Sequence, residues 1–362
     1  MKTSSLLLSS AAILAVGSAF AADLPAKKAA PTATAAATGC PAFGPGYFAI
    51  PGETCIKIGG YVRSDNKYTA NVARGTAPYS LGYKYILGFD TKSNSELGTV
   101  NGRIGMYDSG SGVTTESAYV DLGGFRAGYA PSYVDFSNGY NNSGLQYQPT
   151  GNGVIGYTMP VGTTSISVAA ESASQTSSNK TTTYSASRPD LILAATSKIG
   201  DVTLKGGLVS HEVVATTGSA QGFAALGRAD LAFGDATVKL GAAYANGAVS
   251  YLDNPSSYVN NKAMNAMADS NSDGTGLSIA SMATGALEYN INKNKDQVYA
   301  YAGSESGSNS TASYAKNTYG IGFKYNIAKG MYVRPETYQT VETKGATRTT
   351  TNYFYLRIRR DF

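Results

Sequence analysis

The sequence predicts an all-β protein, a 16-stranded antiparallel transmembrane β-barrel. Three observations lead to this prediction: few charged residues, a strand-like alternation of apolar and polar residues, and tight turns that join the alternating runs in pairs. Only 15% of the 362 residues are charged, against about 25% in an ordinary soluble domain. The 42 glycines and 27 tyrosines disfavour helix interiors, which excludes a helical bundle. A net charge of +5 without a concentrated basic stretch excludes a nucleic-acid partner.

The N-terminus has the pattern of a secretory signal peptide. Lys2 gives the positive start, an apolar stretch follows, and Ala19-Phe20-Ala21 forms a cleavage site. We therefore expect a signal peptide over residues 1–21, an Ala/Pro/Thr-rich periplasmic linker over 22–39 and the barrel over 40–362. No later segment has the roughly 18 consecutive apolar residues of a spanning helix, which excludes a helical membrane protein.

The two cysteines of this exported chain lie 15 positions apart. A disulfide between Cys40 and Cys55 is the expected use of such a pair. Metal binding is the alternative, but two thiols and the distant His211, the only histidine, make a poor zinc site. We expect the disulfide, and neither a metal nor a cofactor.

From Cys55 onward, runs of about ten residues alternate between apolar and polar positions. In residues 83–90, for example, Tyr83, Tyr85, Leu87 and Phe89 alternate with polar or small residues. This is the period of a strand with two unlike faces, and the length suits a tilted strand that crosses a bilayer.

Seven tight-turn signals lie between these runs, and each turn joins two runs into a hairpin. They are Asn94-Ser95, Gly123-Gly124, Val161-Gly162, Gly200-Asp201, Gly234-Asp235, Asn292-Lys293-Asn294 and Lys329-Gly330. Seven turns join fourteen strands, and one strand before the first turn and one after the last make 16, with eight long loops at the other end. A soluble β-sandwich is the alternative, but its strands are shorter and its loops do not sort into short and long ends. A closed barrel also leaves no strand edge exposed to lipid.

Several segments are similar to a known family. They are residues 40–55 with their two cysteines, the following residues 56–63, residues 95–99, residues 118–128 and the terminal Phe362. Together they resemble the porin family of α-proteobacteria such as the Rhizobiales and Brucella group. One departure is Arg360, which stands three from the end where outer-membrane barrels commonly carry an aromatic residue.

The resemblance implies a function and partners. It implies a homotrimeric outer-membrane porin that forms a passive, water-filled channel for small hydrophilic solutes and ions, with its third external loop folded into the lumen. Outer-membrane lipid and lipopolysaccharide would surround it. An N-terminus at Ala22 after signal cleavage suggests linkage to peptidoglycan, by analogy with related barrels that begin Ala-Asp. No enzymatic activity is expected.

In a channel, the functional site is the lining of the lumen. The strand phases place twelve cations on the inner face: Lys57, Arg63, Lys84, Arg103, Arg126, Lys205, Arg228, Lys239, Lys324, Arg334, Arg357 and Arg359. They place eight acids there: Asp65, Asp90, Asp121, Glu171, Asp230, Glu288, Glu336 and Asp361. The excess of cations predicts a slight preference for anions.

The third long loop, from about Ala130 to Asn152, is expected to narrow the lumen opposite a basic cluster. The residues predicted to form this constriction are Arg63, Arg103, Arg126, Asp135, Tyr133 and Tyr140. We expect the three arginines to set the ion preference.

Other functions are possible for such a barrel. A surface adhesin with a plugged barrel would carry bulky apolar residues inside, whereas most inward positions here are predicted to be charged, Gly, Ser, Thr or Asn. A hydrolase is disfavoured because His211 is expected to be a solvated loop residue without an oriented nucleophile. A sugar channel would use an aromatic track, for which the inward tyrosines are Tyr61, Tyr299, Tyr301, Tyr332, Tyr338, Tyr353 and Tyr355. Residues 269–274 match only the opening of a calcium-binding loop, and no metal site is expected there.

Overall fold

A computed structural model describes most of the chain after residue 38. The described residues are 39–51, 53–70, 76–136, 152–172, 187–215, 218–252, 277–292, 296–308 and 313–362. The predicted signal peptide, all of the predicted linker except Gly39, the predicted constriction residue Tyr140 and the motif at 269–274 lie outside them. Gly39–Phe362 form one compact unit. No helix in the described ranges is long and apolar enough to cross a membrane.

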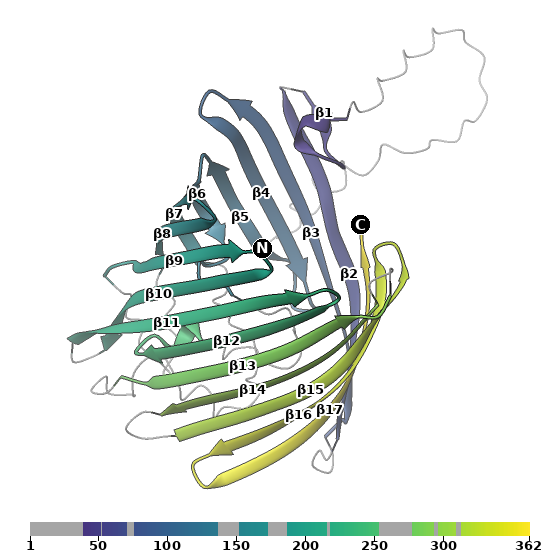
Figure 1. Cartoon of the computed structure of the whole chain (residues 1–362), viewed down its shortest axis with the longest axis vertical. Helices are drawn as coiled ribbons and strands as arrows, with labels where there is room; N and C mark the ends of the chain where they lie inside the picture. Colours follow the sequence, from purple (N-terminus) through teal and green to yellow (C-terminus); the bar gives the residue numbers. More distant parts are fainter. Residues whose placement is uncertain are drawn as a thin grey trace, which may run out of the picture. The chain divides into compact units, whose positions relative to one another are not determined.

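The prediction of a closed 16-stranded antiparallel barrel is confirmed (Figure 1). Each strand from β2 to β17 pairs with the next, and β17 pairs with β2 to close the ring. The strands are β2 (Thr54–Ala70), β3 (Tyr79–Ser95), β4 (Gly98–Asp108), β5 (Thr114–Leu122), β6 (Phe125–Ala130), β7 (Asn152–Val161), β8 (Thr164–Glu171) and β9 (Asp190–Ile199). The second half comprises β10 (Val202–Ala215), β11 (Gly218–Phe233), β12 (Ala236–Asn246), β13 (Ile279–Asn290), β14 (Gln297–Ser308), β15 (Ser313–Ala328), β16 (Met331–Lys344) and β17 (Thr347–Asp361).

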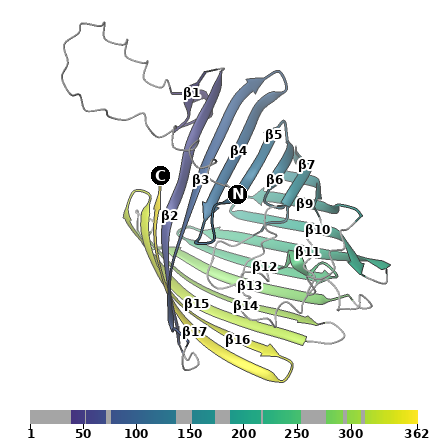
Figure 2. The ribbon, with the colours of Figure 1, turned by 180° about the vertical axis from the view of Figure 1, so that it is seen from behind.

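Alternation along each strand separates an outer from an inner face. On β2 the side chains of Ile58 and Val62 are 46% and 51% exposed on the outside, whereas the Arg63 side chain is only 13% exposed. The antiparallel register then fixes the neighbours, because Arg63 stands opposite Lys84 of β3 and Arg359 of β17. Figure 2 shows these strands from behind.

Short connections gather at one end of the barrel, as predicted. Gly123 and Gly124, between β5 and β6, both have positive φ values (56° and 93°), which suit a tight hairpin turn. The predicted turn at Val161-Gly162 is wrong by one residue, because Val161 still pairs with Thr164. The predicted turn at Asn94-Ser95 is wrong by two residues. The register continues to the pair of Ser95 with Gly98, so the turn residues lie between them.

The other end does not carry eight long loops, and this expectation is wrong. Only two residues, 216–217, separate β10 from β11, and only two, Gly345 and Ala346, separate β16 from β17. The third connection, between β6 and β7, does span residues 131–151, within the predicted boundaries. Length is therefore concentrated in a few connections, which can reach into the lumen.

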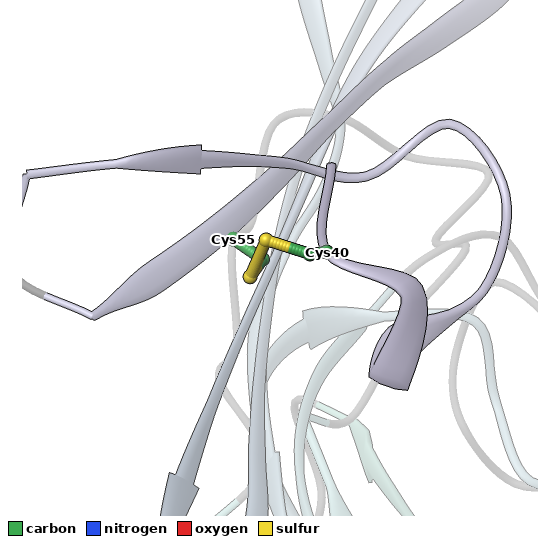
Figure 3. The surroundings of a disulfide bond; sticks show 2 residues. All are labelled: Cys40 and Cys55. Atoms are coloured by element: carbon green, nitrogen blue, oxygen red, sulfur yellow. A yellow bond between two sulfur atoms is a disulfide. The ribbon is translucent and has the colours of Figure 1, made fainter. Parts of the chain in front are cut away.

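A small extension precedes the barrel. It contains η1 (Pro41–Phe43) and β1 (Phe48–Ile50), and β1 pairs with the start of β2. The predicted disulfide between Cys40 and Cys55 is confirmed, with an S–S distance of 2.02 Å (Figure 3). β17 pairs with β2 only from Tyr61 onward, and β1 pairs with the first residues of β2, Thr54 to Ile56.

Candidate functional site in the barrel lumen

One part of the inner face carries a network of charges. We call the inner faces of β14–β17 and β2–β6 the charged wall. Arg357, 1% exposed, donates from Nε and Nη2 to the two carboxylate oxygens of Asp65 (2.7 and 3.2 Å). Its Nη2 also donates to the hydroxyl of Tyr355 (2.7 Å). Arg63 Nε lies 2.8 Å from Asp65 Oδ2, so one carboxylate is shared by two guanidinium groups.

Two further arginines of the charged wall have carboxylates of their own. Arg103 Nη1 donates to Asp90 (2.8 Å), and its Nη2 lies 3.5 Å from Glu116. Arg126 makes a bidentate contact with Asp121 (2.7 and 3.0 Å). These contacts hold the guanidinium groups against the wall, and the carboxylates compensate much of their charge.

Tyrosines fill the space between these charges. Tyr299 and Tyr301 of β14 each donate a hydroxyl hydrogen bond of 2.7 Å to Glu336 of β16. The rings cross the intervening strand β15 above Gly320 and Gly322, where a Cβ atom would overlap them. The glycines at these inward positions therefore let the aromatic rings lie flat along the wall.

The rest of the inner face is different. We call the inner faces of β7–β13 the apolar wall. Its buried residues, each 5% exposed or less, include Val154, Ile192, Val209, Leu226 and Met282. They occupy the inward-facing positions, which on the charged wall are held by charged residues. The expectation that most inward positions are charged or small is therefore wrong for this part of the barrel.

Residues 132–136, at the start of the third loop, cover the apolar wall. The backbone N–H of Tyr133 donates to Glu171 Oε1 of β8 (2.9 Å). The side chains of Val134 and Phe136, 0% and 3% exposed, pack on Gly207 of β10. Arg228 Nη1 of β11 donates to the Phe136 carbonyl oxygen (3.0 Å). The segment thus crosses the inner faces of several strands within the barrel.

A second segment, residues 248–252, packs on the same wall and is anchored by a buried polar group. The Tyr251 hydroxyl donates to Asp190 Oδ2 (2.6 Å), and His211 Nδ1 lies 2.7 Å from Asp190 Oδ1. All three side chains are at most 1% exposed. The expectation that His211 is a solvated loop residue is therefore wrong. β10 continues past it, and its phase points the imidazole inward.

The structure brings three of the predicted constriction residues together. Arg103 and Arg126 flank Tyr119, and the Arg126 guanidinium carbon lies 4.5 Å from the centre of that ring. Tyr133 lies over Gly156, which stands opposite Arg126 in the register of β6 and β7. Burial raises the pKa of Tyr133.

The other predicted residues lie elsewhere. Arg63 belongs to the group around Asp65 and Arg357, and the register places Arg103 opposite Asp90, away from it. Asp135 lies on the segment between Tyr133 and Phe136, half-buried. Sequence reasoning missed the apolar wall, although the inward phase of β9–β11 already contains Ile192, Val209 and Leu226. The apolar inward residues are confined to a few neighbouring strands, whereas the inward positions of the other strands are mostly polar.

The closed barrel and the lined lumen agree with comparisons to known proteins. Residues 27–356 match the family described as the porin subfamily. This chain belongs to that family. It is 39% identical over 147 residues to the outer membrane protein y4fJ of Sinorhizobium fredii (36% of this chain, 43% of that protein). It is 36% identical over 160 residues to the porin Omp2b of Brucella suis (39% and 44%). The chain thus spans less than half the length of either relative.

Among solved structures, the barrel is similar to the outer membrane channel DcaP of Acinetobacter baumannii. The TM-score is 0.72 at 17% identity, over 87% of this chain and 99% of that one. The likeness supports the porin fold. With the family membership, it places this protein in the outer membrane.

Proposed function

We propose that this porin-family protein is a passive, water-filled channel for small hydrophilic solutes and ions. The charged wall carries the proposal, because ionised side chains on the inside of a membrane barrel require water in the lumen. Arg103 and Arg126 there have carboxylate partners, and their side chains are 28% and 31% exposed, an arrangement suited to a wetted surface. Membership of the porin family supports the same function.

We propose that the third loop sets the width of this channel. Residues 132–136 narrow the lumen by covering the apolar wall, and they face the charged wall across the remaining space. The constriction would be formed by Tyr133, Asp135 and Tyr140 of the loop with Arg103 and Arg126 of the wall, and Arg63 would line the lumen at a different level. Solutes would then pass along the charged wall.

We propose a homotrimer whose interface includes the outer face behind the charged wall. Polar side chains stand there at outward positions: Ser64, Asn66, Thr337, Gln339 and Asn352. We call this set the outer polar patch. Gln339 Nε2 donates to Asn352 Oδ1 (2.8 Å), and Asn66 Nδ2 donates to the Leu356 carbonyl (3.3 Å). Amides are costly against lipid and favourable against a second polar surface.

The proposed interface can be tested by replacing Asn66 and Gln339 with leucine. We expect the trimer to dissociate at a lower temperature in gels that preserve oligomers, because interhelical or interstrand polar contacts in membranes are worth about 1 kcal/mol each. Ala242→Leu, on the outer face of β12 beside the exposed Leu240, is the matched control and should leave the trimer unchanged. Equal stability of both variants would argue against this interface.

The surroundings of the barrel are also part of the proposal. Lipid and lipopolysaccharide would cover the rest of the outer face. Signal cleavage after Ala21 would leave Ala22 to be linked to peptidoglycan through residues 22–39. The intact mass of the N-terminal peptide from muramidase-treated envelopes would test this linkage.

A second candidate function is a surface adhesin or structural barrel without a conducting lumen. The apolar wall favours it, because bulky buried side chains and two chain segments occupy part of the interior. Single-channel recording of the purified protein in planar bilayers distinguishes the two. We expect ohmic conductance that opens in three steps. A protein that inserts but does not conduct would reject the channel and favour the adhesin.

A further inference from the structure

Lysines of the charged wall lie over tyrosine rings. The Lys84 ammonium nitrogen is 4.2 Å from the centre of the Tyr107 ring on the neighbouring strand β4. The Lys324 ammonium nitrogen of β15 is 4.8 Å from the centre of the Tyr332 ring of β16. Both lysines are half-buried on the inner face. A tyrosine ring thus holds each ammonium group along the lumen.

The same pairing occurs towards both ends of the charged wall. Near the end of β2, Lys67 lies 5.6 Å from the centre of the Tyr353 ring. At the start of the wall, Lys57 and Lys92 lie 5.9 and 5.1 Å from the centre of a single ring, that of Tyr47. We call these five lysines the lysine track. The two lysines on β2 are ten residues apart, about 33 Å along the strand.

The disulfide-closed extension supplies the first ring of the track. Tyr47 immediately precedes β1, and β1 pairs with β2 at Cys55, which stands opposite Lys92 of β3. The disulfide to Cys40 ties the extension to this position. The extension therefore contributes a side chain, that of Tyr47, to the lumen lining.

The lysine track differs from the arginines in how its charge is compensated. Within the described ranges, none of the five lysines has a carboxylate oxygen within 4.0 Å. Arg103 and Arg126, in contrast, lie 2.8 and 2.7 Å from Asp90 and Asp121. A carboxylate cancels the charge of its partner at a distance. An aromatic ring attracts the cation through its quadrupole but carries no net charge.

We propose that the lysine track makes the channel prefer small anions, both inorganic ions and carboxylates. The tyrosines fix the ammonium groups along the path without adding a negative charge, and no carboxylate of the described residues lies in contact with them. The paired arginines contribute less to ion preference than the sequence suggested. This inference rests on the proposed channel function and adds the class of solute that the channel favours.

Reversal potentials across a planar bilayer under a gradient of dilute potassium chloride test the inference. We expect the wild type to pass chloride in preference to potassium. Lys84→Gln and Lys324→Gln should each lower the anion-to-cation permeability ratio by about three- to five-fold, the effect of one unit charge about 4 Å from an ion in water. Lys84→Arg, which keeps the charge, should retain the ratio. Heat-modifiable migration in gels shows that each variant is folded.

The matched control removes a compensated lysine together with its carboxylate. Lys239→Gln with Glu288→Gln abolishes an ion pair of 2.5 Å on the inner faces of β12 and β13 and should leave the ratio unchanged. Tyr107→Leu keeps the charge of Lys84 but removes its ring, and should lower the ratio less than Lys84→Gln does. An equal ratio in Tyr107→Leu and wild type would overturn the role of the ring.

The outcomes separate the two proposals. A channel that conducts but shows no anion preference, or whose lysine variants match the wild type, would overturn this inference and leave the channel function intact. A correctly folded protein that conducts no current would overturn the channel function and this inference with it.

Discussion

The charged and apolar walls are built on the same backbone and differ in what occupies alternate positions. Both consist of antiparallel strands that each pair with the next, and both carry exposed apolar side chains on the outer face. On the charged wall the inner positions hold ion pairs such as Arg126 with Asp121. On the apolar wall they hold residues such as Ile192 and Leu226. The backbone hydrogen bonds fix the barrel, and the inner side chains decide which chain segments pack against it.

The difference explains where the long connections go. An apolar inner surface facing water would be unfavourable, at about 25 cal/mol per Å² of exposed apolar area. Residues 132–136 and 248–252 cover it with their own apolar side chains. The ion pairs of the charged wall gain nothing from such a cover, and the Arg103 and Arg126 side chains remain 28% and 31% exposed. The lumen therefore has one wall that holds the loops and one wall that solutes can follow.

The largest expected effect comes from loosening the cover of the apolar wall. Phe136→Ala removes a ring that packs on Gly207, and large-to-small changes of this kind cost about 3 kcal/mol. We expect the third loop to leave the wall and the single-channel conductance to rise. Leu208→Ala, a neighbouring change on the outer face where that side chain is 55% exposed, should leave the conductance as it is. If both variants conduct like the wild type, the loop does not limit the channel.

A smaller effect is expected at the buried anchor of the second segment. Asp190→Asn replaces the carboxylate that accepts from Tyr251 and contacts His211, a loss of about 2 kcal/mol for hydrogen bonds to a charged group. Residues 248–252 should then exchange their amide hydrogens faster, as measured by mass spectrometry. Tyr251→Phe, which loses one hydrogen bond but keeps the ring, should show about half the change in free energy. Unchanged exchange in Asp190→Asn would mean that apolar packing alone holds the segment.

The smallest effect concerns Asp296, in the connection where the apolar wall (β13) gives way to the charged wall (β14). The backbone N–H of Asn326 donates to it (2.7 Å), as does the side chain of Asn292 (2.7 Å). These hydrogen bonds, that from the Asn326 backbone first, hold the pKa of Asp296 below its usual range. Its stabilising contribution is therefore complete above about pH 4 and is lost as the pH falls through the lowered pKa.

Unfolding in denaturant at a series of acidic pH values measures this contribution. Between about pH 5 and pH 2, the wild type should lose stability more steeply than Asp296→Asn, which cannot titrate at this position. Parallel curves for the two proteins would show that the junction between the walls does not depend on this carboxylate.

The barrel itself could be predicted because its signals are local. Alternation has a period of two residues and survives in every strand, and turns such as Gly123-Gly124 need a backbone conformation that few residues adopt. The disulfide followed from the presence of only two cysteines in an exported chain. The strands, the turns and the disulfide do not depend on which residues lie across the lumen.

The division of the lumen could not be predicted in the same way. Val209 and Leu226 face inward by the same alternation as Arg228. An apolar side chain at such a position is favourable only because residues 132–136 cover it. His211 has the same explanation, since its partners Asp190 and Tyr251 come from β9 and from the segment after β12.

The sequence by itself determined the number of strands, their antiparallel order, the end that carries the short turns and the residues that face inward. Those properties depend on hydrogen bonds between neighbouring strands and on the two unlike solvents at their faces. The tertiary structure alone decided which inward cations have a carboxylate in contact and which do not. Compensation depends on distances of a few ångströms between side chains of different strands, as for Arg126 beside Asp121 and Lys84 over Tyr107.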